Sequence, residues 1–153
     1  MDVQELADRD AIHSVLVRYC ECIDGRDIDR LAREVYTEDA VDDHGWGPWS
    51  GVEAILDGLR PLLDRFVGTA HLLSNVQIEL IDGEARASSG VTAWHWATGN
   101  EKGTADFVAV GVYTDQLVRT GAGWRIRHRR FGPIGPTIKA AGVLPPMPTI
   151  EQQ

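Results

Sequence analysis

The sequence predicts an α+β fold, in which N-terminal helices pack inside a strongly curved antiparallel sheet and form a cone-shaped barrel. Three observations support this fold class. Apolar residues in the first part of the chain recur at three- and four-residue steps, as on one face of a helix. The second part holds four long segments rich in β-branched and aromatic residues, separated by glycine turns. Helices followed by a run of antiparallel strands are typical of α+β domains.

Three helices are expected in the first part of the chain. The first covers residues 4–23 and ends before Gly25, a residue type that commonly terminates helices. Asp27 is the expected N-cap of a short second helix. The third begins at the capping-box sequence SGVE of residues 50–53 and is kinked or ended by Pro61. The apolar stripe of the first helix consists of Ile12, Val15, Leu16, Tyr19, Cys20 and Ile23.

Strands account for most of the remaining chain. A short strand is expected at residues 40–43, followed by a loop at residues 44–49 that is rich in glycine and proline. Four long strands come later, and the Asp82-Gly83 pair between the first two is typical of a tight type I′ hairpin. The long strands are expected at residues 70–81, 85–98, 104–119 and 124–131.

The third long strand predicts association between copies of the chain. Its segment 107–113 is apolar on both faces. One face would cover a cavity between the sheet and the helices, and the other needs a second protein surface. We therefore expect a homo-oligomer, either a dimer or a trimer, formed through the sheet.

Size and composition indicate one globular domain. The chain has 153 residues, of which 43% are hydrophobic and 25% are charged, as in ordinary soluble domains. We expect the domain to cover residues 1–132, and a proline-rich tail at residues 133–153 to pack on it or on a neighbouring subunit. The net charge of -8 disfavours nucleic acid and anionic membrane surfaces as partners.

The N-terminus has neither the basic nor the apolar region of a signal peptide, and no apolar run approaches the ~20 residues of a membrane span. A cytoplasmic protein is expected. Cys20 and Cys22 point in different directions on a helix, so we expect two reduced thiols rather than a disulfide or a zinc site.

Asp24 and His71 are the main candidates for chemistry. Asp24 lies at the end of the first helix and His71 near the start of the first long strand, and the predicted fold brings these ends together over one cavity. A carboxylate that binds one imidazole nitrogen leaves the other nitrogen free to accept a proton. The hypothesis is a general base, and hence an enzyme. The alternatives are a structural histidine and a helix-end aspartate.

Six short segments are informative through their order and spacing: residues 7–12, 19–24, 36–40, 50–55, 111–117 and 123–129. Together they resemble the nuclear transport factor 2-like superfamily, in particular its SnoaL-like branch. The resemblance covers roughly residues 5–132 and implies the conical α+β barrel.

Several enzymes of this branch share an elimination site: scytalone dehydratase, bile-acid 7α-dehydratase and hexachlorocyclohexane dehydrochlorinase. The site combines an aspartate at the end of the first helix, a histidine that opens the first long strand, and an arginine in the last strand. The resemblance therefore implies catalytic roles for Asp24, His71 and Arg129. Tyr19 matches a tyrosine of the dehydratases and would act as an acid or hydrogen-bond donor. A core tyrosine is the alternative.

The sequence leaves open whether Arg129 or Arg130 faces the cavity. Strict alternation puts Arg130 on the same strand face as the core-type residues Trp124 and Ile126, whereas the resemblance selects Arg129. A β-bulge would reconcile the two arguments. Either arginine would bind an anionic or leaving group.

Tryptophans are expected to give the cavity an aromatic wall that binds a small hydrophobic molecule. Trp94 and Trp96 share one face of the second long strand, while Trp46 and Trp49 lie in the loop before the third helix. Core packing is the alternative for these side chains. The resemblance places Trp94 and Trp96 near residues that assist the leaving group in dehydratases, although tryptophan cannot transfer a proton. Asn75, two alternations beyond His71, is expected to donate a hydrogen bond in the pocket.

No metal site is expected, because the adjacent residues Asp42, Asp43 and His44 diverge on a strand. No glycine-rich phosphate loop or GxSxG motif occurs, so no nucleotide, flavin or other cofactor is expected. The resemblance implies a cofactor-independent lyase of the dehydratase or dehydrohalogenase type. An isomerase or cyclase with the same base, and a non-catalytic ligand-binding or assembly module, are the alternatives.

Overall fold

The computed structural model of the chain describes residues 2–97, 106–135 and 138–139. Its elements confirm the predicted α+β fold class. They follow in the order α1 (Val3–Asp24), α2 (Asp29–Glu34), β1 (Tyr36–Asp43), β2 (Trp49–Ser50), α3 (Val52–Leu63), β3 (Gly68–Ile81), β4 (Glu84–Trp96), β5 (Phe107–Thr120), β6 (Gly123–Pro133) and β7 (Ile138–Lys139).

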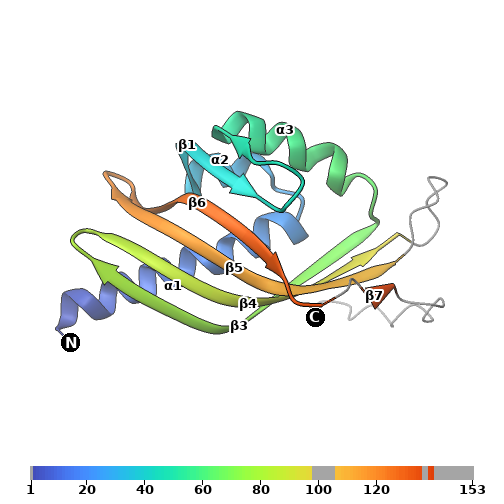
Figure 1. The fold of residues 1–153 in the computed structure, drawn as a ribbon. Helices are drawn as coiled ribbons and strands as arrows, with labels where there is room; N and C mark the ends of the chain where they lie inside the picture. The colour runs from blue at the N-terminus through green and yellow to red at the C-terminus, as the bar shows by residue number, and fades with distance from the viewer. Residues whose placement is uncertain (1, 98–105, 136–137, 140–153) are drawn as a thin grey trace, which may run out of the picture.

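The strands form one sheet with the order β2-β1-β6-β5-β4-β3, and β7 pairs with β5. The four long strands are antiparallel neighbours, as the sequence predicted. β1, however, runs parallel to β6, so the sheet is mixed. Figure 1 shows that the sheet is strongly bent, that α1 crosses behind β3, β4 and β5, and that α2 and α3 lie above β6. This arrangement brings the end of α1 to the start of β3.

The ends of α1 are fixed by hydrogen bonds. At its start, the Asp2 carboxylate accepts a hydrogen bond of 2.7 Å from the Glu5 backbone N–H. At its end, the Gly25 N–H donates to the Glu21 carbonyl at 2.8 Å. Arg26 follows with a φ of 60°, a left-handed conformation that turns the chain sharply away from the helix. Asp24 therefore occupies the last turn of a well-anchored helix.

The other helix boundaries correct the two expected N-caps. The N-cap of α2 is Ile28, with no side-chain hydrogen bond, so the prediction that Asp27 caps this helix is wrong. The N-cap of α3 is Gly51, again without a side-chain bond, because residues 49–50 belong to the short strand β2. Pro61 lies inside α3, which continues to Leu63.

Two β-bulges change which side chains face inward. On β6, Ile126 pairs with Leu117 and His128 pairs with Gln116, so Arg127 is an extra residue in the ladder. On β3, Ser74 pairs with Gly90 and Gln77 pairs with Ser88, so two β3 residues oppose one residue of β4. An extra residue reverses the inside–outside alternation beyond it. Strict alternation of side chains therefore assigns the wrong face to residues beyond the bulge in each strand.

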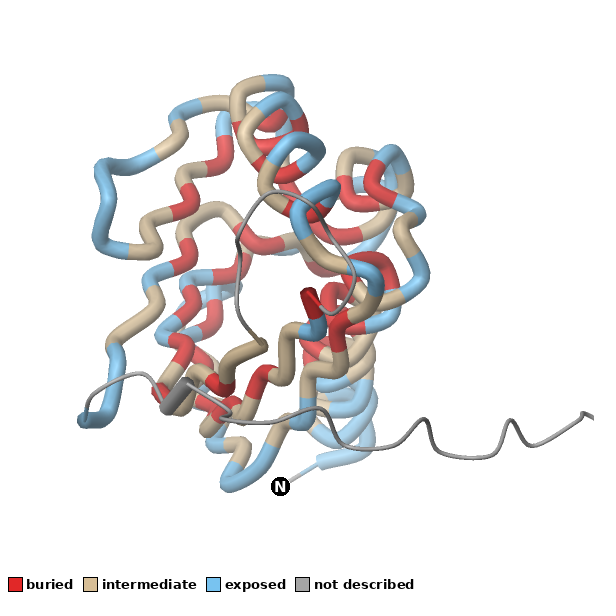
Figure 2. The backbone as a smooth tube through the Cα atoms, turned by 90° about the vertical axis from the view of Figure 1, so that its right-hand side faces the viewer, coloured by how far each residue is buried: buried red, intermediate tan, exposed pale blue. Residues whose placement is uncertain are grey.

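The core lies between the helices and the inner face of the sheet, and the buried residues in Figure 2 follow this space. On β4 the inward-facing residues are the odd-numbered ones, most of which are small. They include Ala85, Ala87, Ser89, Val91 and Ala93.

The expected tail at residues 133–153 falls mostly outside the described residues. Within the described part, β7 pairs antiparallel with β5. Among the described residues, no helix combines the length and the apolar character needed to cross a membrane.

Candidate active site

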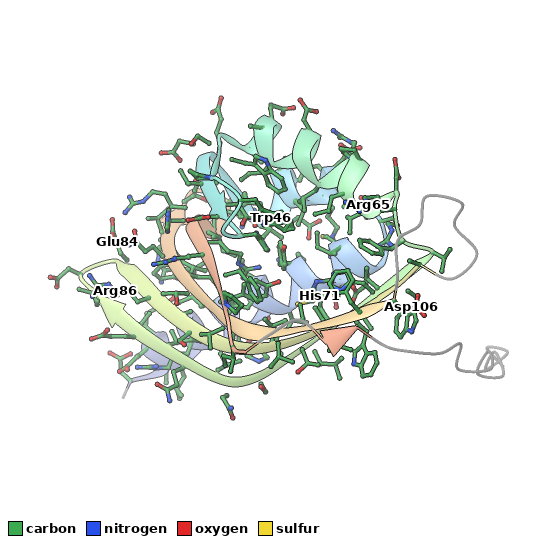
Figure 3. The ribbon with its side chains drawn as sticks, turned by 45° about the vertical axis from the view of Figure 1, so that its right-hand side comes forward. Trp46, Arg65, His71, Glu84, Arg86 and Asp106 are labelled. Carbon is green, nitrogen blue, oxygen red and sulfur yellow. The ribbon has the colours of Figure 1, made fainter. Side chains whose placement is uncertain are left out.

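A cavity of about 640 Å³ lies between α1, α3 and the inner face of the sheet. Of the residues predicted from the sequence, Tyr19, Trp46 and His71 line it. Figure 3 shows Trp46, from the loop after β1, above His71, with Arg65 near the edge of the same space. The walls are mainly apolar and aromatic, and therefore suit a hydrophobic ligand.

Asp24 and His71 are in direct contact, as expected. The Nδ1 atom of His71 lies 2.7 Å from Oδ1 of Asp24, and the His71 backbone N–H donates to Oδ2 at 2.8 Å. Because a carboxylate can only accept, Nδ1 carries the hydrogen in this bond. The other ring nitrogen, Nε2, is then a proton acceptor when the imidazole is neutral.

A short chain of hydrogen bonds positions the Asp24 carboxylate. The Thr69 hydroxyl donates to Oδ1 of Asp24 at 2.9 Å, and the Arg26 guanidinium donates to Thr69 Oγ1 at 2.9 Å. Arg26 also donates to the Ile23 carbonyl at 2.7 Å, which ties the turn to the end of α1. Partial burial alone would raise the pKa of Asp24, but the hydrogen bonds from His71 and Thr69 outweigh it and lower that pKa. The carboxylate is therefore ionised at neutral pH.

Tyr19 and His95 lie beside His71. The ring centroids are 6.5 Å from His71 for Tyr19 and 5.7 Å for His95, both in edge-to-face geometry. Burial raises the pKa of the Tyr19 phenol, so this hydroxyl is a neutral hydrogen-bond donor. Burial and the neighbouring His71 lower the pKa of His95 to about 4. His95 is therefore neutral at physiological pH, and its Nδ1 donates to the Ala93 carbonyl at 3.1 Å.

Arg129 is buried, as the resemblance required, but it lies behind the cavity wall. Its guanidinium forms two hydrogen bonds with Asp115, at 2.7 and 2.8 Å, and both side chains are fully buried. Its Cζ lies 4.0 Å from the centroid of Tyr19 and 4.2 Å from that of Tyr113. Burial opposes its charge, yet Asp115 raises the pKa of Arg129 above its ordinary value. The guanidinium thus packs over the rings of the two tyrosines, which themselves line the cavity.

The bulges explain why two other residues that were predicted for the site face away from the cavity. Arg130 is exposed, because the bulge at Arg127 turns Arg129 inward instead. Asn75 has a φ of 49° at the β3 bulge and is exposed on the sheet, outside the cavity lining. The expectation that Asn75 points into the pocket is therefore wrong.

The expected tryptophan wall is wrong for three of the four tryptophans. Trp94 and Trp96 stack on each other at 6.3 Å on the outer face of β4, because the small odd-numbered residues and His95 face inward. Trp49 packs against Gly58 of α3, where an added Cβ would lie 2.4 Å from the indole. Trp46 lines the cavity, although it is 62% exposed.

A second histidine–carboxylate pair escaped the sequence reasoning. Nδ1 of His44 lies 2.7 Å from Oδ1 of Asp42, but not in line for a hydrogen bond. Residues two apart on a strand share a face, and this spacing was the available signal. In the sequence, these two residues suggest at most a pair of metal ligands. Tyr113 and His95, which also line the cavity, were not singled out as site residues either.

Other reactive groups contribute little to the site. Burial raises the pKa of Cys20 to about 12, so its thiol is a poor nucleophile at neutral pH. Within the described residues, no group of three or more histidine, cysteine, aspartate or glutamate side chains is arranged to hold a metal ion.

Comparison with known proteins identifies the domain. Residues 4–130 match the model of the SnoaL-like domain. An uncharacterized protein of Mycobacterium tuberculosis is 33% identical over 131 residues, which cover 84% of this chain and 87% of that protein.

Solved structures with similar folds include the following two. A candidate scytalone dehydratase from Novosphingobium aromaticivorans has a TM-score of 0.81 and 24% identity, and the match covers 99% of this chain and 100% of that chain. A hexachlorocyclohexane dehydrochlorinase from Novosphingobium barchaimii has a TM-score of 0.82 and 22% identity, over 95% of this chain and 100% of that chain. At these identities the likeness establishes the fold alone.

Proposed function

Because this chain belongs to the SnoaL-like domain family, we propose that it is a cofactor-independent lyase that removes a proton from carbon in a hydrophobic substrate. The observation that carries the proposal is the contact between His71 and Asp24 in the cavity wall, with 2.7 Å between Nδ1 and Oδ1. Such a pair supplies a base with a fixed tautomer and a fixed direction.

In the proposed reaction, Nε2 of His71 accepts the proton from a carbon next to an electron-withdrawing group. The electrons of that C–H bond form a double bond, and a leaving group departs from the neighbouring carbon. The Asp24 carboxylate stabilises the imidazolium that forms. Tyr19, a neutral phenol in the cavity wall, donates a hydrogen bond to the negative charge that develops on the substrate.

The cavity favours a small to mid-sized hydrophobic substrate. Its volume of about 640 Å³ lies within the range of sites that enclose drug-sized molecules. Leucines of α3 and aromatic residues of β5 and β6 supply part of the apolar wall, including Leu59, Leu63, Phe107 and Phe131.

The similar structures include a dehydrochlorinase and a candidate dehydratase, and both names describe eliminations. An isomerase or cyclase would use the same base and differ only after proton removal. The fate of the carbanion therefore distinguishes these activities, whereas a non-catalytic binding module would show no proton transfer.

Proton transfer can be tested with a panel of simple ketones that lack a leaving group, from cyclohexanone to 4-phenylbutan-2-one and larger. We expect the protein to catalyse exchange of their α-protons in D2O, followed by ¹H NMR. His71→Gln and Asp24→Asn should each lower the exchange rate by about 10²–10⁴. His13→Gln, at an exposed position on α1, is the matched control and should exchange at the wild-type rate.

Thermal unfolding of each variant separates loss of the base from loss of the fold. If no ketone of the panel exchanges, or if His71→Gln exchanges at the wild-type rate, the proposed base is wrong. A binding module would then be the better interpretation, and it predicts ligand uptake without exchange.

A further inference from the structure

The cavity contains a second histidine beside a carboxylate, on the wall formed by β1 and the loop after it. The Nδ1 atom of His44 lies 2.7 Å from Oδ1 of Asp42, whose side chain is fully buried. The His44 ring stacks on Phe131, with centroids 5.7 Å apart and an interplanar angle of 22°. Only 18% of the His44 side chain is exposed, and the ring lines the cavity. His44 is therefore fixed in position, with Nε2 as its remaining polar atom.

Asp42 is an ionised group in a buried setting. The Tyr36 hydroxyl donates to its Oδ2 at 2.6 Å, and both side chains are buried. Burial opposes ionisation, but His44, Tyr36 and Arg129 outweigh that effect and lower the pKa of Asp42.

His44 is placed to balance the buried charge of Asp42. Two carboxylates, Asp42 and Asp115, lie fully buried in this region. Arg129 is committed to Asp115 through two hydrogen bonds. Within the described residues, His44 is the group in direct contact with Asp42 that can carry a positive charge. A buried carboxylate is costly without a cationic partner, and His44 lies where it can be that partner when its ring carries a proton.

Two tyrosine rings connect His44 to His71. Tyr113 lies 6.0 Å from His44 and 5.7 Å from Tyr19, and Tyr19 lies 6.5 Å from His71, all measured between ring centroids. All four rings line the same cavity. Each histidine has its Nδ1 against a carboxylate, which leaves Nε2 for the ligand. The cavity thus contains two histidine–carboxylate pairs, on separate parts of its wall.

We propose that His44 is the general acid of this site, and that its substrates are β-hydroxy carbonyl compounds whose hydroxyl leaves as water. This inference rests on the proposed function, because it assigns the partner of the His71 base. His71 takes the α-proton, the C–H electrons form the carbon–carbon double bond, and the C–O bond breaks. The departing oxygen takes the proton of His44 Nε2, so the products are an unsaturated carbonyl compound and water.

The chemistry of the leaving group supports this choice of substrate. Hydroxide leaves poorly and needs a proton during C–O cleavage, whereas chloride leaves as a stable anion without an acid. A wall that places a histidine beside a buried carboxylate, where the ring can supply that proton, is therefore suited to dehydration. After turnover His71 is protonated and His44 is neutral, and proton exchange with water restores both groups.

The test uses two compounds that differ by one hydroxyl group. Exchange of the α-protons of 4-phenylbutan-2-one in D2O reports on the base alone. Conversion of 4-hydroxy-4-phenylbutan-2-one to 4-phenylbut-3-en-2-one, followed by ultraviolet absorbance, needs both base and acid. The variants are His44→Gln and His44→Phe, of which the second keeps the stacking on Phe131. His71→Gln and His13→Gln are measured beside them.

We expect each His44 variant to slow dehydration of the hydroxy ketone by about 10²–10⁴ times more than it slows exchange. His71→Gln should lose both reactions and His13→Gln neither. Three results would overturn the assignment of His44: dehydration that is unaffected in both His44 variants, exchange that is lost together with dehydration, and a wild-type protein that exchanges but does not dehydrate. Failure of the wild type to exchange would instead contradict the base, and with it the proposed function.

Discussion

His95 is a neutral histidine enclosed by aromatic rings at one end of the cavity. It stacks on Phe107, with centroids 4.1 Å apart and an interplanar angle of 9°, and it contacts the edge of Phe66 at 5.0 Å. These rings remove water from the imidazole, and His71 adds repulsion to its charged form. The pKa falls from an ordinary 6.5 to about 4. His95 can therefore accept a hydrogen bond at Nε2 without competing with His71 as a cation.

This shift predicts a pH-dependent stability. Between pH 6.5 and 4 the unfolded chain binds a proton at this residue and the folded chain does not, so stability falls as the pH is lowered through that window. The expected loss is about 1–2 kcal/mol, which allows for partial screening by solvent. Urea unfolding at several pH values measures it. His95→Phe, which preserves the stacking, should have a flatter pH dependence than the wild type, and an unchanged dependence would contradict the explanation.

At the scale of elements, the pairing of β5 with β6 supports the wall that holds His44. Gly111 of β5 lies directly under Phe131 of β6, the ring on which His44 stacks. A Cβ at this position would be 2.3 Å from the Phe131 ring and 2.5 Å from the Gly132 carbonyl oxygen. The backbone oxygen cannot move without disturbing the ladder, so the position requires glycine.

Gly111→Ala should therefore lower the free energy of unfolding by about 1–3 kcal/mol. It should also displace Phe131, and a change in the His44 NMR signals would report that displacement. Gly121→Ala is the matched control, because no atom lies within 4 Å of its added Cβ. This control should change stability by no more than about 0.5 kcal/mol. Equal stabilities of the two variants would contradict the proposed clash.

The secondary-structure elements also explain which residues of the site could be predicted from the sequence. Asp24 and His71 were predictable because each lies at the end of an element with clear periodicity. The tryptophan wall was not, because alternation alone leaves two possible faces, and the small residues of β4 decided which faced inward. The choice between Arg129 and Arg130 depended on the bulge at Arg127, and a bulge has no reliable signature in a single sequence.

The wall that carries Asp42 and His44 was harder to predict for a topological reason. β1 begins at Tyr36 rather than at residue 40, and it pairs in parallel with β6. This long-range pairing places the end of β1 beside the cavity, and local patterns along the chain do not report it. The fold class and the order of the long strands, by contrast, followed from hydrophobic periodicity and are confirmed.

At the scale of the whole molecule, the outer face of the sheet exposes apolar side chains. Trp94 and Trp96 stack there, Trp96 is 36% exposed, and Leu72 on the neighbouring strand is 56% exposed. Exposed apolar surface of this kind is typical of protein–protein contacts. The expectation of a homo-oligomer through the sheet remains a prediction, and this surface supports it.

Size-exclusion chromatography with light scattering tests that prediction. The wild-type chain should elute as a dimer or trimer, and Leu72→Lys and Trp96→Lys should shift it towards the monomer, because each places a charge in the apolar contact. Val3→Lys, a similar change at a position that is 83% exposed on α1, should leave the assembly intact. A wild-type monomer at micromolar concentration would contradict the prediction.

The position of Trp49 against Gly58 has a consequence for protein engineering. The loop that carries His44 and Trp46 is held at one end by the pairing of β1 with β6 and at the other by this contact with α3. His71 and Asp24 belong to other elements, α1 and β3. A library of substitutions confined to residues 45–48 can therefore vary the wall of the cavity while His44, His71 and Asp24 keep their identity. Directed evolution of new substrate preferences is best started in that loop.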